Sequence, residues 1–236
     1  MVLAASLAGM LAIGFWFLHS GSGTQPPPSV AASTSPGLAP DRPPRIEPLA
    51  NAGALELDVP VTQARITAIV YHGVGNANVI PLQPVGHQIN ASFLARLGNR
   101  LFGRSSDTPP GYYVDDSAEG PDTGSVDVGA AAGTTIYAPA TGVVVAVRPF
   151  VLNGKQWGDV VQIRPDDAPA VTVSMTNLER DPDVDVGTRV TAGRTPVGKI
   201  ADLSAVLQQT LARYTSDAGN HVAISIGPAP GTSPLL

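Results

Sequence analysis

The fold is decided by residues 127–144, which read DVGAAAGTTIYAPATGVV. Short runs of β-branched and aromatic residues are separated here by turns of glycine, proline and alanine, a pattern typical of strands joined by tight turns. The pattern continues towards the C-terminus, where further strands are predicted at 159–163, 171–175, 188–190, 196–198 and 222–226. Short strands at this spacing favour a mainly β domain with an antiparallel β-sandwich or barrel-like core.

One inserted helix is expected to interrupt these strands. Asp202 can cap a helix over Leu203–Tyr214, because an aspartate side chain accepts hydrogen bonds from the free N–H groups of a first helical turn. The apolar residues of this segment lie on one side at helical spacing, at positions 203, 206, 207 and 211. We expect this amphipathic helix to pack on its own domain.

The composition argues against a nucleic acid partner and excludes thiol chemistry. Of the 236 residues, 14% are charged, and the formal net charge is −5. Nucleic-acid binding depends on a basic surface that neutralises phosphates, so we expect no nucleic acid partner. The chain contains no cysteine, which rules out disulfides and thiolate metal sites.

The N-terminal segment predicts a membrane anchor. Residues 2–18 carry no charged side chain and would extend about 25 Å as a helix. Residues 1–19 are therefore interpreted as a single transmembrane helix or uncleaved signal. A cleaved signal peptide is the alternative, and the lack of Lys or Arg before the apolar run argues against it. Either interpretation predicts an extracytoplasmic C-terminal domain at the cell membrane.

The segments between the anchor and the β domain differ in character. Residues 20–60 are expected to be a disordered linker, because nine prolines stand there among small residues and little apolar surface is available to offset ordering. Residues 61–122 are expected to be a small α+β extension that packs on the core. It contains a strand at 64–71, a glycine-rich loop at 72–78, a helix at 90–102 and a turn-rich stretch at 105–124. Residues 229–236 are expected to be a flexible tail.

Four segments resemble, in the same order, the lysostaphin/LytM-type murein metallopeptidase domain, which has a duplicated hybrid motif fold. Residues 127–144 resemble its opening aspartate and Gly-Thr-x-Val-x-Ala turn, and 157–163 resemble its Gly-Asn-x-Val strand. Residues 186–198 resemble its glycine-rich hairpin, and 220–226 resemble its closing His-x-His strand. The resemblance implies a LytM-like domain over residues 123–228.

The resemblance also implies where a zinc site would lie. In the family, zinc is held by a histidine, by an aspartate four residues later and by the second histidine of His-x-His. The first of these positions falls on Thr123, and the aspartate is Asp127. A second catalytic histidine of the family falls on Asn177, and the closing pair is His221 and Ala223. The resemblance therefore leaves Asp127 as a metal position and His221 as a catalytic position.

The replacements remove most of the chemistry that zinc catalysis needs. Zinc takes imidazole nitrogen and carboxylate oxygen and keeps one position open for water. Ala223 offers no lone pair, a Thr123 hydroxyl is a poor ligand, and Asn177 cannot exchange a proton near neutral pH. We therefore expect no cofactor and no catalysis. Family members with eroded sites imply a membrane-anchored module that binds peptidoglycan or regulates a cell-wall hydrolase.

Two other functions stay open. A rearranged zinc site of His72, Asp127 and His221 would make the chain an active murein endopeptidase, if the upstream segment folds across the cleft. Otherwise His72 is expected to be a loop histidine bonded to the backbone, with Asp127 and His221 bonded to each other. A lipoyl- or biotinyl-type carrier is a third possibility, although Lys155 and Lys199 lack the usual sequence context of a modified lysine.

Aromatic and acidic side chains in the turn-rich stretch form one more candidate site. Tyr112, Tyr113 and Asp115 can contact a ligand at the rim of a cleft, and ordinary packing and turn roles are the alternative.

Overall fold

The computed structural model describes residues 42–75, 78–90, 111–117, 119–206 and 209–230. The chain divides into two compact units, Met1–Gly37 and Leu38–Leu236, and all described residues belong to the second. The expected membrane helix, the first part of the expected linker and most of the expected helix at 90–102 lie outside the described residues. Within the described ranges, no helix has the length and hydrophobicity needed to span a membrane.

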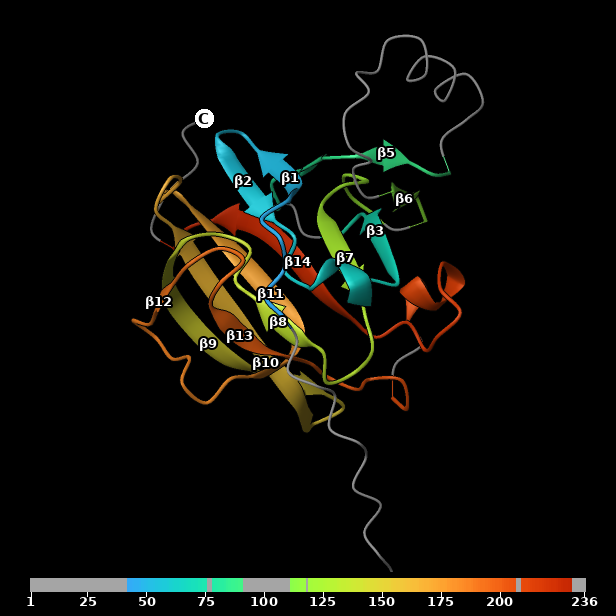
Figure 1. The fold of residues 1–236 in the computed structure, drawn as a ribbon. Coiled ribbons are helices and arrows are strands. Elements are labelled where there is room, and N and C mark those ends of the chain that lie inside the picture. The colour runs from blue at the N-terminus through green and yellow to red at the C-terminus, as the bar shows by residue number, and fades with distance from the viewer. Residues whose placement is uncertain (1–41, 76–77, 91–110, 118, 207–208, 231–236) are drawn as a thin grey trace, which may run out of the picture. The chain divides into compact units, whose positions relative to one another are not determined.

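The described part of the chain is mainly β, as the sequence predicts (Figure 1). One large mixed sheet has the strand order β12-β9-β10-β11-β14-β7-β3-β6-β5. Its strands are β12 (Arg189–Val190), β9 (Gly142–Leu152), β10 (Lys155–Pro165), β11 (Val171–Arg180), β14 (His221–Pro228), β7 (Ser125–Gly129), β3 (Ala68–His72), β6 (Gly111–Asp115) and β5 (His87–Gln88).

Two smaller groups of strands complete the fold. β8 (Thr135–Tyr137) pairs with β13 (Pro196–Ile200), which also pairs with β11. A separate sheet has the order β2-β1-β4, formed by β2 (Leu55–Asp58), β1 (Pro48–Ala52) and β4 (Gln83–Pro84). The expected antiparallel arrangement holds for most pairs, but β6 runs parallel to both β3 and β5. The sheet is therefore mixed.

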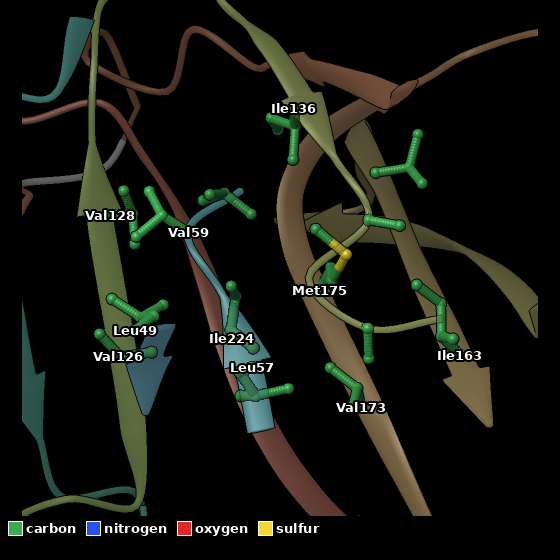
Figure 2. Close-up of a cluster of buried hydrophobic side chains, with 14 of the residues drawn as sticks. Leu49, Leu57, Val59, Val126, Val128, Ile136, Ile163, Val173, Met175 and Ile224 are labelled. Atoms are coloured by element: carbon green, nitrogen blue, oxygen red, sulfur yellow. The ribbon is translucent and has the colours of Figure 1, made fainter. Parts of the chain in front are cut away.

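The side chains of the central strand β7 point alternately to an apolar face and to a polar face of the sheet. Val126 and Val128 are fully buried in the hydrophobic core (Figure 2). Successive side chains of a strand point to opposite faces, so Ser125 and Asp127 lie on the other face. β3 and β14 flank β7 and alternate in the same way, which places the first residue of β14, His221, on the face of Asp127.

The expected disordered linker over 20–60 is wrong for its last part. β1 and β2 form a hairpin there, and Leu49 and Leu57 belong to the main core (Figure 2). The Tyr71 hydroxyl donates a hydrogen bond of 2.7 Å to the carbonyl oxygen of Leu49. The many prolines hid a short alternating run in which Leu55, Leu57 and then Val59 are buried. Such a run is a strand signal that an average over forty residues obscures.

The expected helix over 203–214 is also wrong. The described residues of this segment form turns and a short 3-10 helix, η2 (Thr210–Arg213). Asp202 accepts hydrogen bonds from both the backbone N–H and the hydroxyl of Ser204, so it closes a turn and does not cap an α-helix. Leu203 and Leu211 are both buried. Tertiary packing therefore satisfies the apolar residues without a continuous helix.

The extension before residue 122 differs in detail from the expectation. The predicted strand at 64–71 begins later, because Gln63–Arg65 form a 3-10 helix, η1, and β3 starts at Ala68. The stretch expected to be rich in turns contains the strand β6. The extension is thus joined to the core by backbone pairing of β3 with β7.

The role of the β1–β2 hairpin in the core can be tested with Leu57→Ala. Because Leu57 is fully buried, we expect its truncation to lower the free energy of unfolding by about 2–5 kcal/mol. Ile46→Ala, at a side chain that is 61% exposed just before the hairpin, should change it by less than about 0.5 kcal/mol. Urea denaturation of both variants measures the difference. Equal, small effects would contradict a structured hairpin.

Candidate functional site

The site is centred on Asp127, a carboxylate in the middle of the large sheet. Asp127 lies on β7 directly opposite Ala223 of β14 and Val70 of β3, and it is only 4% exposed. Burying a charged carboxylate is costly unless hydrogen bonds or an opposite charge compensate it. The neighbours of Asp127 on these two strands therefore decide what the site can do.

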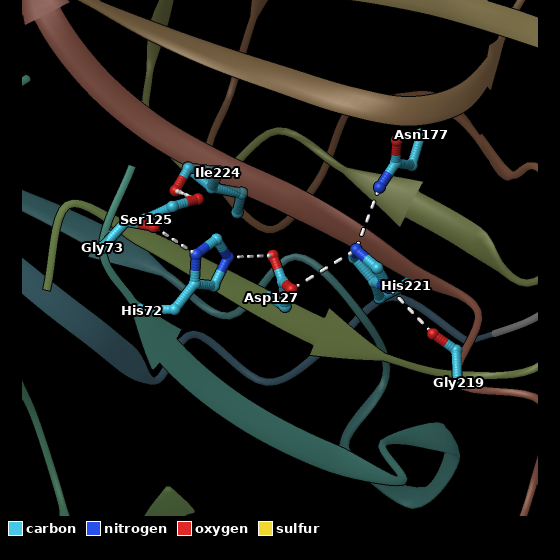
Figure 3. Close-up of polar contacts among 8 residues, drawn as sticks. All are labelled: His72, Gly73, Ser125, Asp127, Asn177, Gly219, His221 and Ile224. Carbon is cyan, nitrogen blue, oxygen red and sulfur yellow. Dashed lines mark hydrogen bonds and ion pairs between the residues drawn. The ribbon is translucent and has the colours of Figure 1, made fainter. Parts of the chain in front are cut away.

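His72 is the first partner of Asp127 (Figure 3). Its Nε2 lies 3.1 Å from Asp127 Oδ1, and its Nδ1 lies 2.8 Å from the carbonyl oxygen of Gly73. A carbonyl and a carboxylate only accept hydrogen bonds, so both contacts are satisfied when each ring nitrogen carries a proton. The hydrogen bond to Asp127 raises the pKa of His72 to about 9, against the opposing effect of burial.

His221 approaches Asp127 from the other neighbouring strand. Its Nδ1 donates to the carbonyl oxygen of Gly219 at 2.8 Å, and its Nε2 lies 2.9 Å from the Asn177 side-chain nitrogen. Since the amide of Asn177 donates, the Nε2 of His221 accepts with its lone pair. The same Nε2 is 3.4 Å from Asp127 Oδ2, longer than an ordinary hydrogen bond. The lone pair of His221 is thus engaged by Asn177.

A strained backbone conformation directs Asn177 towards His221. Asn177 has a φ of 62°, in the left-handed region that asparagine tolerates better than most residues. It lies where the pairing of β10 with β11 shifts its register, between Asp159 and Val161. Its carbonyl accepts a hydrogen bond from the N–H of Ala201 at 3.0 Å. The bulge and this bond fix the side chain at His221.

The structure brings together some of the residues that the sequence singled out and separates others. Asp127, His221, Asn177 and the upstream His72 form one contiguous chain of contacts (Figure 3). Ala223 lies opposite Asp127 and contributes only a methyl group. Thr123 lies in the turn before β7, where its carbonyl accepts a hydrogen bond from Leu82.

The arrangement does not fit a zinc ion. A zinc site needs lone pairs from all donors at about 2.0–2.2 Å from one centre. His72 and His221 contact different oxygens of Asp127, and Figure 3 shows them on opposite sides of the carboxylate. The Nε2 of His221 is also bonded to the Asn177 amide. Among the residues that the structure describes, no group of three His, Asp or Glu side chains is placed to hold a metal ion.

Tyr113 and Asp115 share the polar face with His72, whereas Tyr112 does not. Tyr112 packs edge-on against Tyr71, with ring centroids 5.2 Å apart, and contacts the main core. Tyr113 lies against Tyr214 at 4.8 Å. Asp115 pairs in register with His72 on the neighbouring strand.

Asp115 is held in a network of its own at the edge of the site. It is buried and accepts a hydrogen bond of 3.0 Å from the backbone N–H of Ser117. The hydrogen bonds from Ser117 lower the pKa of the Asp115 carboxyl, and the nearby Arg213 guanidinium at 3.9 Å adds to this effect. Asp115 therefore carries a negative charge near His72 and contributes to the raised pKa of that histidine.

The carbonyls of Gly73 and Gly219 are the functional groups that the sequence reasoning missed. The Gly73 carbonyl orients His72, and the Gly219 carbonyl orients His221, in each case through a hydrogen bond from Nδ1 of the imidazole. Gly219 has a φ of 75°, and a Cβ there would lie 2.5 Å from the backbone nitrogen of Ala212, so only glycine fits. Gly73 directly follows His72, and Gly219 lies two residues before His221. This spacing does not reveal that the glycine carbonyls accept hydrogen bonds from the imidazoles.

Comparisons with known proteins give little further information. No known protein family and no curated protein matches the sequence. One solved structure that matches is that of the SpoIIQ-SpoIIIAH pore forming complex, with a TM-score of 0.38 and 15% identity, covering 78% of this chain and 89% of that chain. At this TM-score the match carries no inference about function, which rests on the geometry of the site.

The raised pKa of His72 predicts a pH-dependent stability. Below about pH 6.5, His72 is protonated in the folded and unfolded chains alike, and the pair with Asp127 contributes fully. As the pH rises towards about 9, the unfolded chain loses this proton first and the stabilisation disappears. We expect a loss on the order of 1–2 kcal/mol after allowance for solvent screening. Urea denaturation between pH 6 and pH 9.5 measures it.

A matched pair of histidine variants controls this pH experiment. His72→Gln should flatten the profile in this range, whereas His87→Gln, at an exposed position, should leave it unchanged. A profile that His72→Gln does not alter would contradict the charged pair.

The conformation of Asn177 predicts different effects for alanine and glycine. Either substitution removes the hydrogen bond to His221, which contributes about 1 kcal/mol. Alanine is less tolerant of the left-handed region than asparagine, so Asn177→Ala costs about 1–2 kcal/mol more. Glycine adopts this region without strain, so Asn177→Gly does not have this extra cost. We expect the alanine variant to have the lower melting temperature in calorimetry. The reverse order would show that residue 177 is not in the left-handed region.

Proposed function

We propose that the chain is a noncatalytic LytM-like module of the cell envelope that binds peptidoglycan or regulates a cell-wall hydrolase. Residues 1–19 would anchor it in the cell membrane, with the C-terminal domain outside the cytoplasm. The observation that carries this proposal is the bond between the Asn177 amide and Nε2 of His221. A neutral amide occupies the lone pair that a general base would use.

The charges of the site support the same proposal. General-base catalysis needs a group with a pKa near the working pH and a free lone pair directed at the reacting proton. His72 has donated both of its N–H groups, and His221 accepts from Asn177. Asp127 is already paired with His72. These side chains satisfy one another and leave no free base for a water molecule.

The polar face of the sheet supports a binding role. Ser174 and Thr176 of β11 pair with Ser225 and Ala223 of β14, and all four are half-buried. Side chains opposite each other on paired strands share one face, so these residues lie on the face of Asp127. Small hydroxyl side chains beside a neutral site suit a ligand rich in hydroxyl and amide groups. Peptidoglycan has this chemistry.

A second candidate is a murein endopeptidase with a rearranged zinc site. It is favoured by one observation, which is that His72, Asp127 and His221 lie together. It requires His72 to give up its bond to Asp127 or to Gly73, so that one nitrogen presents a lone pair to a metal. The two candidates therefore differ in metal content and in activity.

The test combines three measurements on the full-length protein. After incubation with zinc chloride and dialysis, we expect metal analysis to find far less than one zinc per chain. Incubation with purified sacculi should release no muropeptides, and the protein should sediment with the sacculi. Stoichiometric zinc together with muropeptide release would establish the endopeptidase instead.

A pair of surface variants locates the binding face. Thr176→Arg should weaken sedimentation with sacculi about tenfold, equivalent to 1.4 kcal/mol, because the bulky side chain covers the polar face. Val186→Arg, at a residue that is 61% exposed on another loop, adds the same charge elsewhere and should have no effect. Equal behaviour of the two variants would exclude this face as the binding surface.

A further inference from the structure

His72 and His221 belong to different parts of the chain but meet the same carboxylate. His72 ends β3 in the N-terminal extension, and His221 begins β14, the last strand of the sheet. Asp127 lies between them on β7, with His72 Nε2 3.1 Å from Oδ1 and His221 Nε2 3.4 Å from Oδ2 (Figure 3). In the family that the sequence resembles, an aspartate at this position binds a metal ion. Here the donors do not converge on a metal centre.

We propose that the imidazole of His72 has replaced the metal ion as the partner of Asp127. The pair is then a structural joint that holds the N-terminal extension on the LytM-like domain. This inference does not depend on whether the chain binds peptidoglycan, because it concerns only the contact between His72 and Asp127.

The hydrogen-bond directions carry the proposal. The carbonyl of Gly73 fixes the ring of His72 from one side at 2.8 Å, and Asp127 accepts from the other side at 3.1 Å. Both ring nitrogens of His72 thus face acceptors, and the Nε2 atoms of His72 and His221 lie at different oxygens of Asp127. The Asp127 side chain is 6% exposed, and a buried carboxylate without a partner would be unfavourable. The N–H of His72 supplies that partner.

The position of His72 explains why the joint matters for the fold. His72 is the last residue of β3. The N–H of Ile80 bonds to the carbonyl of Ile226 near the end of β14. The imidazole therefore fixes the end of the strand that pairs with β7. Asn177 performs a parallel task for His221 by filling its remaining lone pair.

Nitrogen NMR of histidine side chains tests the proposal on the wild-type protein. The full-length chain, labelled with ¹⁵N at histidine, should show two ring N–H groups for His72 and a single one, at Nδ1, for His221. Zinc chloride should leave these signals unchanged. Stoichiometric zinc binding with loss of the His72 N–H signals would overturn the proposal, whatever the result with sacculi.

A double-mutant cycle tests the joint independently. His72→Gln and Asp127→Asn should each lower the melting temperature, and the double variant should lose less than the sum, because the two residues act as one unit. Strict additivity would overturn the proposal.

Chemical rescue tests the joint in a third way. In His72→Gly the cavity left by the ring should accept free imidazole, so imidazole should raise the melting temperature. His87→Gly, at an exposed histidine, is the control and should not respond. Absence of imidazole rescue in His72→Gly would refute the joint.

Discussion

The need to compensate one buried carboxylate dominates the polar half of this structure. Asp127 lies in the centre of a large sheet with strands on both sides, and it is almost inaccessible to water. A single negative charge in such a place must be matched by donors from the neighbouring strands. β3 supplies such a donor through His72, whereas His221 on β14 lies 3.4 Å from the second oxygen with its Nε2 engaged by Asn177. The position of β3 is thereby coupled to one side chain.

The register of the sheet is what makes this arrangement possible. Val126 and Val128 fill the core, while Asp127 between them points to the opposite face. A shift of one residue along β7 would exchange these faces, placing the carboxylate among the apolar side chains of the core and the valines on the polar face. The hydrophobic core and the polar site therefore specify the same register. The packing energy of the valines keeps Asp127 in reach of both histidines.

The sequence predicted the β domain better than its borders. The later strands follow from local patterns, whereas only the resemblance to the LytM-type family implied that Asp127, Asn177 and His221 belong to one site. The β1–β2 hairpin was missed because its few apolar residues lie in a proline-rich segment, and the expected helix over 203–214 failed because separate tertiary contacts bury its apolar residues. The contact of His72 with Asp127 spans 55 positions and depends on the pairing of β3 with β7. No local pattern encodes that pairing, so the sequence could name His72 only as one possible substitute ligand.

The charge balance of the site separates binding from catalysis. A divalent cation beside one carboxylate leaves excess positive charge, which can polarise a carbonyl or acidify a bound water. His72 brings one positive charge, which Asp127 cancels, and Asn177 with the accepting His221 adds none. The charges of His72 and Asp127 thus cancel, and the hydrogen-bonding groups of these side chains bond to one another or to backbone carbonyls. On the proposed binding function, a ligand on this face would be recognised by neighbouring hydroxyl groups and by shape.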